Sequence, residues 1–195
     1  MILNKILGYM SDSEMKSLVR TFSRFNKPDT IGVEIGSLHG RSSREISKAI
    51  NKGTLYCIDN WGGYDSHCDK FSDSEIEKFN YPPKGSFCTL EFFLENTKGC
   101  KNIITIKGNS PNVVKNWDKK IDFVFLDALH KNPSDWENIE FWLPKIKSGG
   151  VLSGHDYFPK INLWPDVHDN VVRLEKQLGK QVVNPPNTSI WYFEV

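Results

Sequence analysis

Hydrophobic residues near the start of the chain recur every three or four positions, which is the spacing of one face of a helix. They are Met15, Leu18, Val19, Phe22 and Phe25. Ser11 and Glu14 stand before them with the spacing of a capping box, a pair that satisfies the first free N–H groups of a helix. The pattern therefore predicts a helix over residues 11–26, ended by Pro28 and Asp29.

Over the rest of the chain, short β-rich runs alternate with stretches of helical periodicity. The expected strands are 31–36, 54–59, 103–107, 121–127 and 149–154. The expected helices are 41–50, 89–98, one opening at Pro133, and 166–178, and residues 181–183 and 190–193 are expected to form a terminal antiparallel pair. Alternating strands and helices are typical of α/β proteins. We therefore predict a doubly wound, mostly parallel sheet with a C-terminal antiparallel strand pair.

Residues 60–86 break this alternation. Gly62-Gly63, Pro82-Pro83 and Gly85 interrupt the segment around a short helical stretch at about 74–79. A connection of this length inside a compact domain is more often a functional loop than a passive link. We expect a substrate-binding or lid loop here, with partial disorder as the alternative.

Length and charge narrow the classes of protein. A chain of 195 residues fits one domain, so residues 1–195 are expected to form a single unit. Lys and Arg total 25 against 24 Asp and Glu, so no strong field indicates nucleic acid or a membrane as a partner. The four scattered cysteines form no redox or zinc pair, and no secretion signal or membrane span is apparent. We expect a soluble cytoplasmic protein, acting alone or as a homo-oligomer.

In a doubly wound sheet the carboxyl ends of the parallel strands meet at one edge, where ligands bind. The polar residues at those predicted ends are Glu34, Asp59, Asn109, Ser110, Asp127, His130, His155 and Asp156. These side chains are the candidates for binding and catalysis.

A glycine turn follows the first predicted strand. Gly36 and Gly40 are separated by three residues, a spacing that matches neither the dinucleotide fingerprint nor the phosphate loop. Glu34 on the strand would repel a pyrophosphate and would suit a cationic ligand. The spacing argues against a nicotinamide oxidoreductase, and an ordinary tight turn remains the alternative.

Together with Asp59, this turn resembles the class I S-adenosylmethionine-dependent methyltransferases, which implies a Rossmann-like fold. In that family the turn holds the methionine part of the cofactor, and the acid ending the second strand binds the ribose hydroxyls. The segment 107–110 resembles the one that contacts the adenine, although an acid is common where this chain has Asn109. The implied cofactor-binding residues are Glu34, Gly36, Ser37, Gly40, Ser42, Asp59, Asn60, Trp61, Asn109, Ser110 and Asp127.

The segments 125–130, 142–151 and 154–157 resemble a subgroup that includes metal-dependent macrolide-sugar O-methyltransferases. The resemblance implies methylation of a hydroxyl on a sugar, glycan or small molecule. It also implies that Asp127 and His130 act as metal ligand and general base, and imidazole titrates in the range that a base requires. The alternative for His130 is a partly buried histidine that bonds only the backbone.

The same resemblance implies a divalent cation, Mg²⁺ or Mn²⁺, on Asp127, His155 and Asp156. Mg²⁺ prefers oxygen ligands. A histidine at position 155 therefore either turns away, leaving the two aspartates, or shifts the preference toward Mn²⁺, Fe²⁺ or Zn²⁺. Two rival functions keep the fold: a metal-dependent hydroxylase-like enzyme, and a cofactor-binding domain without catalysis.

Overall fold

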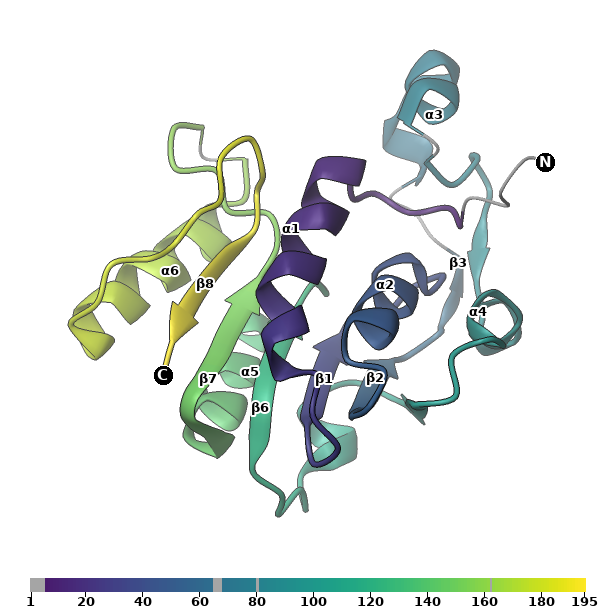
Figure 1. The fold of residues 1–195 in the computed structure, drawn as a ribbon. Coiled ribbons are helices and arrows are strands. Elements are labelled where there is room, and N and C mark those ends of the chain that lie inside the picture. Colours follow the sequence, from purple (N-terminus) through teal and green to yellow (C-terminus); the bar gives the residue numbers. More distant parts are fainter. Residues whose placement is uncertain (1–5, 65–67, 80, 162) are drawn as a thin grey trace.

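A six-stranded sheet forms the centre of the protein (Figure 1). The computed structural model describes residues 6–64, 68–79, 81–161 and 163–195. In sheet order the strands are β5 (Ile103–Lys107), β2 (Thr54–Asp59), β1 (Ile31–Ile35), β6 (Ile121–Leu126), β7 (Ile146–Gly154) and β8 (Trp191–Glu194). Neighbouring strands run parallel except β8, which pairs antiparallel with β7. The predicted fold class is confirmed.

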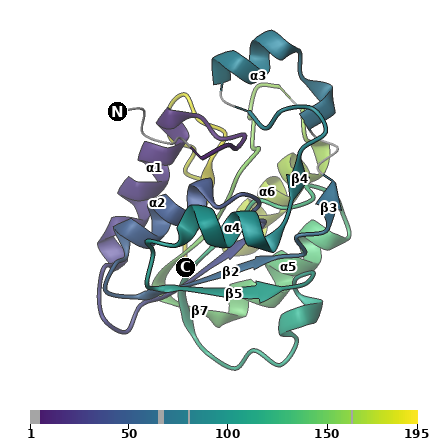
Figure 2. The same ribbon diagram turned by 90° about the vertical axis from the view of Figure 1, so that its right-hand side faces the viewer.

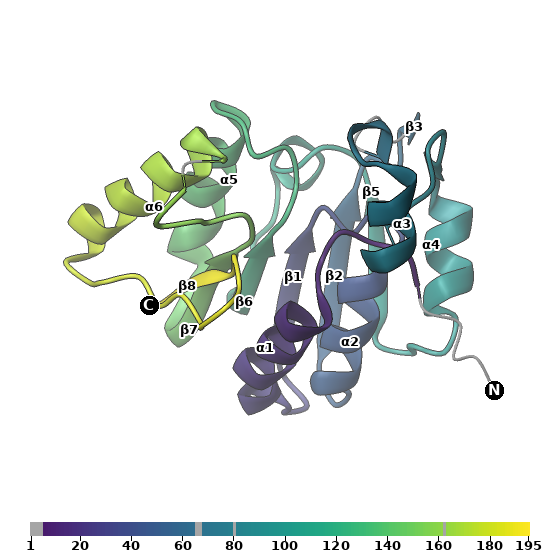
Figure 3. The same cartoon turned by 90° about the horizontal axis from the view of Figure 1, so that it is seen from above.

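Helices cover both faces of the sheet, as Figure 3 shows from above. One face carries α1 (Asp12–Phe22), α2 (Arg41–Ala49) and α4 (Leu90–Thr97), whose buried side chains share one hydrophobic cluster. The other face carries α5 (Ser134–Trp142) and α6 (Pro165–Leu178), which contribute to a second cluster. The molecule is thus a three-layer α/β/α arrangement with a core on each side of the sheet.

Alternation along the central strands supplies both cores. Val124 and Leu126 belong to the cluster under α5 and α6, while Phe123 and Phe125 belong to the cluster under α1 and α2. Phe22 of α1 stacks on Phe123 with the ring centroids 4.1 Å apart. A central strand buried on both faces has this continuous hydrophobic pattern, as in other parallel sheets.

The capping box of the first helix is present. The Ser11 hydroxyl accepts a hydrogen bond from the Glu14 backbone N–H at 3.3 Å, and the Ser11 N–H donates to Glu14 Oε2 at 2.8 Å. Regular α-helix ends at Phe22, and a 3₁₀ turn over Ser23–Phe25 continues it. The predicted helix is confirmed, with a tighter last turn.

The end of the chain pairs differently from the prediction. Residues 181–183 form no strand, and only Val183 makes a single antiparallel bridge, to Tyr192. The main partner of β8 is β7, along Val151 to Gly154. The free edge of β7 satisfies the backbone groups of β8 along four residues, so this strand pairs with the sheet edge.

The segment after β2 contains a two-stranded ribbon, β3 (Gly63–Tyr64) with β4 (Phe87–Cys88), a 3₁₀ turn at Cys68–Lys70, and α3 (Asp73–Phe79). Residues 65–67 and 80 of the predicted loop lie outside the described residues. Helix α3 buries none of its residues and stands away from the sheet in Figures 1 and 2. No helix among the described residues combines the length and apolar character that crossing a membrane requires.

Candidate functional site

The glycine turn brings the ends of β1 and β6 into contact. Gly36 has a φ of +87°, and a Cβ at this position would lie 1.9 Å from the carbonyl oxygen of Asp127. Gly40 also has a φ of +87° and begins α2, where a Cβ would lie 2.7 Å from Thr97. Both positions therefore require glycine, because the left-handed backbone and the close approach each exclude a side chain.

Glu34 lies beneath this turn and is fully buried. Its Oε2 accepts hydrogen bonds from the hydroxyls of Ser37, at 2.8 Å, and Ser43. Its Oε1 has no hydrogen-bond partner among the described residues. Burial raises the pKa of Glu34, although neighbouring serines, among them Ser42, oppose the shift. An incompletely paired buried carboxylate is suited to a cationic ligand.

Asp59, at the end of β2, binds two backbone groups. Its Oδ2 accepts from the Leu38 N–H at 2.9 Å, and its Oδ1 accepts from the Trp61 N–H at 2.8 Å. Each carboxylate oxygen can accept a further hydrogen bond, so a ribose diol remains within the capacity of Asp59. The carboxylate thus ties the glycine turn to the start of the 60–86 segment.

Two other predicted cofactor residues follow Asp59. Trp61 is 3% exposed, its indole N–H donates to the Leu38 carbonyl at 3.0 Å, and its ring packs against Phe93. Asn60 is exposed and accepts a hydrogen bond from the Gly62 N–H. The Trp61 indole is therefore held in the core, whereas the Asn60 side chain lies at the surface.

In the predicted adenine-binding segment, too, one side chain is exposed and the other is bonded within the protein. Asn109 is exposed, while the Ser110 hydroxyl donates to Asn138 Oδ1 at 2.5 Å and accepts from the Trp142 indole at 3.2 Å. The Ser110 side chain therefore connects the end of β5 to helix α5, and Asn109 is the more accessible of the two.

The second group of predicted residues converges at the ends of β6 and β7. His130 Nε2 lies 3.0 Å from Asp156 Oδ2 and 3.6 Å from Asp127 Oδ1. His155 Nδ1 lies 3.3 Å and 3.4 Å from the same two oxygens. His130 and Asp156 both have positive φ, +54° and +62°, which is strained for a side-chain-bearing residue. Strain of this kind is concentrated at functional sites.

Only part of this cluster is accessible. The side chains of Asp127, His130 and Asp156 are 18%, 13% and 17% exposed, while that of His155 is 8% exposed. One donor atom from each of the first three residues lies within 4.8 Å of the others, a compact set of two oxygens and one nitrogen. Two of the three predicted metal ligands belong to it, with His130 in the place expected for His155.

Charges compensate one another within the cluster. Burial alone would lower the pKa of His155, but Asp127 and Asp156 raise it well above its ordinary value. Burial likewise opposes the lowered pKa of Asp156, which His155 and His130 produce. An imidazolium at His155 therefore offsets the negative charge of the two aspartates.

Sequence reasoning missed three neighbours of this cluster. Glu14 Oε1 lies 3.1 Å from His155 Nε2, and the Trp164 ring centroid lies 5.1 Å from that of His130. Asp135 stands near His130, and burial raises the pKa of Asp135 to about 6. The capping box singled out Glu14, but nothing local in the sequence indicates its contact with a residue 141 positions away.

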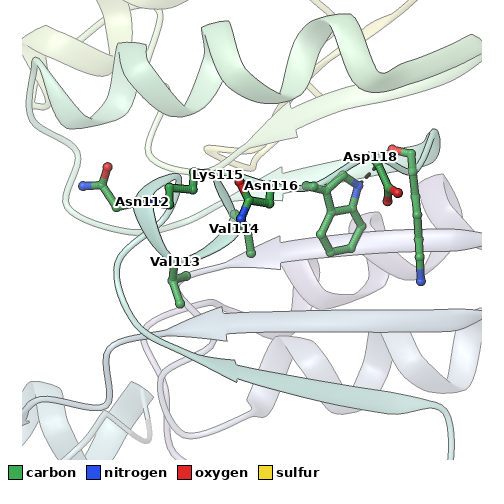
Figure 4. A pocket seen from close by; sticks show the side chains of 8 residues that line it. Asn112, Val113, Val114, Lys115, Asn116 and Asp118 are labelled. Atoms are coloured by element: carbon green, nitrogen blue, oxygen red, sulfur yellow. Dashed lines mark hydrogen bonds between the residues drawn. The ribbon is translucent and has the colours of Figure 1, made fainter.

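Neither of two cavities among the described residues offers an acceptor-sized space at the candidate site. A groove of about 320 Å³ is lined by residues 112–119 in the connection between β5 and β6, and it holds none of the candidate residues (Figure 4). A cavity of about 10 Å³ lies against His130, Asp135 and His155.

Residues 33–157 match the model of a family described as a methyltransferase domain. The matched stretch includes the glycine turn, Asp59 and the cluster from Asp127 to Asp156, and it spans more than half of the chain. The chain belongs to this family, and it is an S-adenosylmethionine-dependent methyltransferase.

Solved structures share the fold. The O-methyltransferase NovP aligns with a TM-score of 0.64 at 15% identity, covering 93% of this chain and 78% of NovP. The calicheamicin methyltransferase CalS11 aligns with a TM-score of 0.62 at 13% identity, covering 93% and 77%. SMU.1697c of Streptococcus mutans, a putative methyltransferase in complex with SAH, aligns at 0.56 and 14%, covering 95% and 97%. At these identities the likeness concerns the fold.

Proposed function

We propose that the protein transfers a methyl group from S-adenosylmethionine to a hydroxyl oxygen of a sugar, glycan or other small molecule. The observation that carries this proposal is the accessible cluster of Asp127, His130 and Asp156 beside the glycine turn. An alcohol is a weak acid and requires a base to accept its proton. The cluster offers such a base at the edge of the sheet where the carboxyl ends of the parallel strands meet. NovP and CalS11, an O-methyltransferase and a calicheamicin methyltransferase, support the choice of acceptor.

The cofactor would lie along the glycine turn. Glu34 supplies negative charge beneath the turn, and Asp59 offers its remaining lone pairs to the ribose hydroxyls. Gly36, Ser37, Gly40 and Ser42 would border the methionine part, and Asn109 would lie toward the adenine. For Trp61 and Ser110 the proposed contact is through the backbone, because their side chains are engaged within the protein.

S-adenosylmethionine, when bound, supplies a methyl group on a positively charged sulfur, and the methyl carbon passes to the acceptor oxygen as the carbon–sulfur bond breaks. His130 accepts the hydroxyl proton on ring nitrogen Nδ1 as the new carbon–oxygen bond forms, because Nε2 donates its own hydrogen to the Asp156 carboxylate. Asp156 and Asp127, 3.0 Å and 3.6 Å from His130 Nε2, stabilise the imidazolium that results. The products are a methyl ether, a neutral thioether and a proton on His130.

The donor set also fits a divalent cation. Asp127 and Asp156 would hold it through oxygen, with His130 as a nitrogen donor, a combination suited to Mn²⁺ as well as Mg²⁺. Such an ion would make the acceptor hydroxyl more acidic. A neutral imidazole ring has one free nitrogen lone pair, so His130 cannot bind an ion and accept a proton at the same time, and dependence on metal distinguishes its two roles.

The test is a methyl-transfer screen with sugar, phenol and glycan acceptors, run with and without a chelator. Transfer to a hydroxyl that His130→Ala reduces by about 100-fold or more is expected for a general base. Full activity of His130→Ala across the pH range would refute the base. Loss of activity with chelator, restored by Mg²⁺ or Mn²⁺, would assign the cluster to metal binding. Turnover that demands O₂ and a reductant would instead indicate hydroxylation.

A further inference from the structure

Glu14 of α1 is part of a buried contact that joins the N-terminal helix to the candidate active site. Its Oε1 lies 3.1 Å from His155 Nε2 and accepts hydrogen bonds from Ser189, from the backbone N–H at 3.1 Å and the hydroxyl at 2.8 Å. The side chains of Glu14 and His155 are only 11% and 8% exposed. Three segments far apart in the chain therefore meet at one carboxylate oxygen.

The ring of His155 is held from both sides. Nε2 faces Glu14, while Nδ1 faces Asp127 Oδ1 at 3.4 Å and Asp156 Oδ2 at 3.3 Å. Carboxylate oxygens only accept hydrogen bonds, so each ring nitrogen acts as a donor in this arrangement. Any rotation of the ring would break contacts on both sides together. The same Asp156 oxygen lies 3.0 Å from His130 Nε2.

We propose that Glu14 is a positioning residue of the active site. By fixing the His155 ring it fixes the carboxylates of Asp127 and Asp156, and these in turn orient His130 toward the acceptor. The catalytic part of this inference rests on the proposed function, whereas the orientation of the two histidine rings does not.

The two oxygens of Glu14 have separate partners, which allows its two roles to be separated. Oε2 accepts from the N–H and the hydroxyl of Ser11 and so completes the helix cap, while Oε1 faces His155 and Ser189. Glu14 also lies outside residues 33–157, the stretch that the family model matches. The contact between Glu14 and His155 thus joins the matched stretch to a helix that lies outside it.

Helix α1 is anchored firmly enough to serve as a support. The Arg41 guanidinium donates to the Gly8 carbonyl and to Asp12 Oδ1, each at 2.9 Å. At the other end of the helix, Phe22 stacks on Phe123 of the central strand. A positioning group is effective only when its own side chain and element are locked by packing and hydrogen bonds.

Histidine-ring nitrogen NMR tests the orientation directly. The chain has five histidines, so the ring resonances can be assigned by single substitutions. Glu14→Gln keeps the shape of the side chain and removes its charge, and Ser11→Ala weakens the cap while leaving the Oε1 contacts. We expect Glu14→Gln to shift the ring nitrogens of both His155 and His130, and Ser11→Ala to leave both unchanged.

Wild-type ring resonances in Glu14→Gln, or equal shifts in Ser11→Ala, would overturn the proposal. Calorimetric binding of S-adenosylmethionine shows that each variant is folded. Should Glu14→Gln not fold, Ser189→Ala removes one donor to the same oxygen and must shift the His155 ring. An unchanged His155 ring in that variant would also overturn the proposal.

The effect of Glu14 on catalysis is measured with an acceptor found in the methyl-transfer screen. Removing the partner that orients a ligating or catalytic histidine typically costs about 10- to 100-fold. We expect Glu14→Gln to lower kcat by that factor with little change in KM for S-adenosylmethionine, and Ser11→Ala to retain kcat. An unchanged kcat in Glu14→Gln would overturn the catalytic role. If the wild type methylates no hydroxyl, the proposed function fails while the ring orientation is still decided by NMR.

Discussion

Two acidic residues near the glycine turn occupy different environments. Glu34 is fully buried, and one of its oxygens lacks a hydrogen-bond partner among the described residues. Asp59 is partly exposed and accepts one backbone N–H on each oxygen. A change at Glu34 is therefore expected to act on cofactor binding through charge. A change at Asp59 is expected to act through lost hydrogen bonds.

Asp59→Ala should weaken binding of S-adenosylmethionine by at least 10-fold. A hydrogen bond to a charged group contributes about 1.5–3 kcal/mol, and the substitution also frees the N–H groups of Leu38 and Trp61 that shape the turn. Titration calorimetry measures the effect, with the exposed Asp29→Asn as control. Equal affinities for the wild type and Asp59→Ala would disprove the role of Asp59.

Binding of S-adenosylmethionine should weaken as the pH falls into the range where Glu34 gains a proton. Burial raises the pKa of Glu34, so its carboxyl is protonated at a higher pH than an exposed glutamate. A cationic ligand favours the ionised form, and binding therefore tightens as the pH rises through that pKa. Dissociation constants measured at several pH values check this, and Glu34→Gln should flatten the curve. The same slope in Glu34→Gln would assign the dependence to another group.

At the scale of elements, glycines with positive φ stand at two helix ends, and only one of them is crowded. Gly40 begins α2, and a Cβ there would lie 2.7 Å from Thr97 and 3.2 Å from Phe93. Gly179 ends α6 with a φ of +61°, and a Cβ there would meet no atom within 4 Å beyond its neighbours in the chain. Comparing substitutions at Gly40 and Gly179 therefore separates the cost of backbone strain from the cost of steric contact with α4.

Gly179→Ala should destabilise the protein by about 1–2 kcal/mol, the cost of a left-handed conformation for an L-residue. Gly40→Ala should cost more, because it adds displacement of α4 to the same backbone strain. Urea unfolding of both variants gives the difference. If the two substitutions cost the same, the contact between α2 and α4 at Gly40 is looser than the structure indicates.

Local patterns allowed most elements to be predicted, and long-range pairing explains what could not be. The capping box at Ser11 and the run from Thr54 to Asp59 specify a helix start and a strand by their own residues. The partner of β8 depends on the free edge of β7, which no neighbouring residue encodes. In the same way, the strand-end rule identified Asp127 and His130, but the contact of Glu14 with His155 depends on the packing of α1.

At the scale of the whole molecule, the sheet and its two helical layers place the strand-end candidates at one edge, and the α3 region stands clear of the layers. A cluster of aromatic rings connects this region to the N-terminal segment. Tyr9 lies 5.4 Å from Tyr81 and 5.7 Å from Phe71, and Phe71 lies 4.6 Å from Tyr81, between ring centroids. Phe71 and Tyr81 flank α3 in the chain, and α3 buries no residue of its own.

Tyr81→Ala should therefore release α3 without unfolding the rest of the protein. Backbone hydrogen exchange over residues 73–79 should quicken by at least 10-fold, while the melting temperature changes by no more than a few degrees, because both sheet cores are untouched. Phe92→Ala, which removes an exposed ring from α4, is the matched control and should leave that exchange unchanged. If α3 forms a wall of the acceptor site, Tyr81→Ala also raises KM for the acceptor and leaves the affinity for S-adenosylmethionine as it is. A large drop in melting temperature would instead make the aromatic cluster part of the main core, and α3 would then be a fixed element rather than a lid.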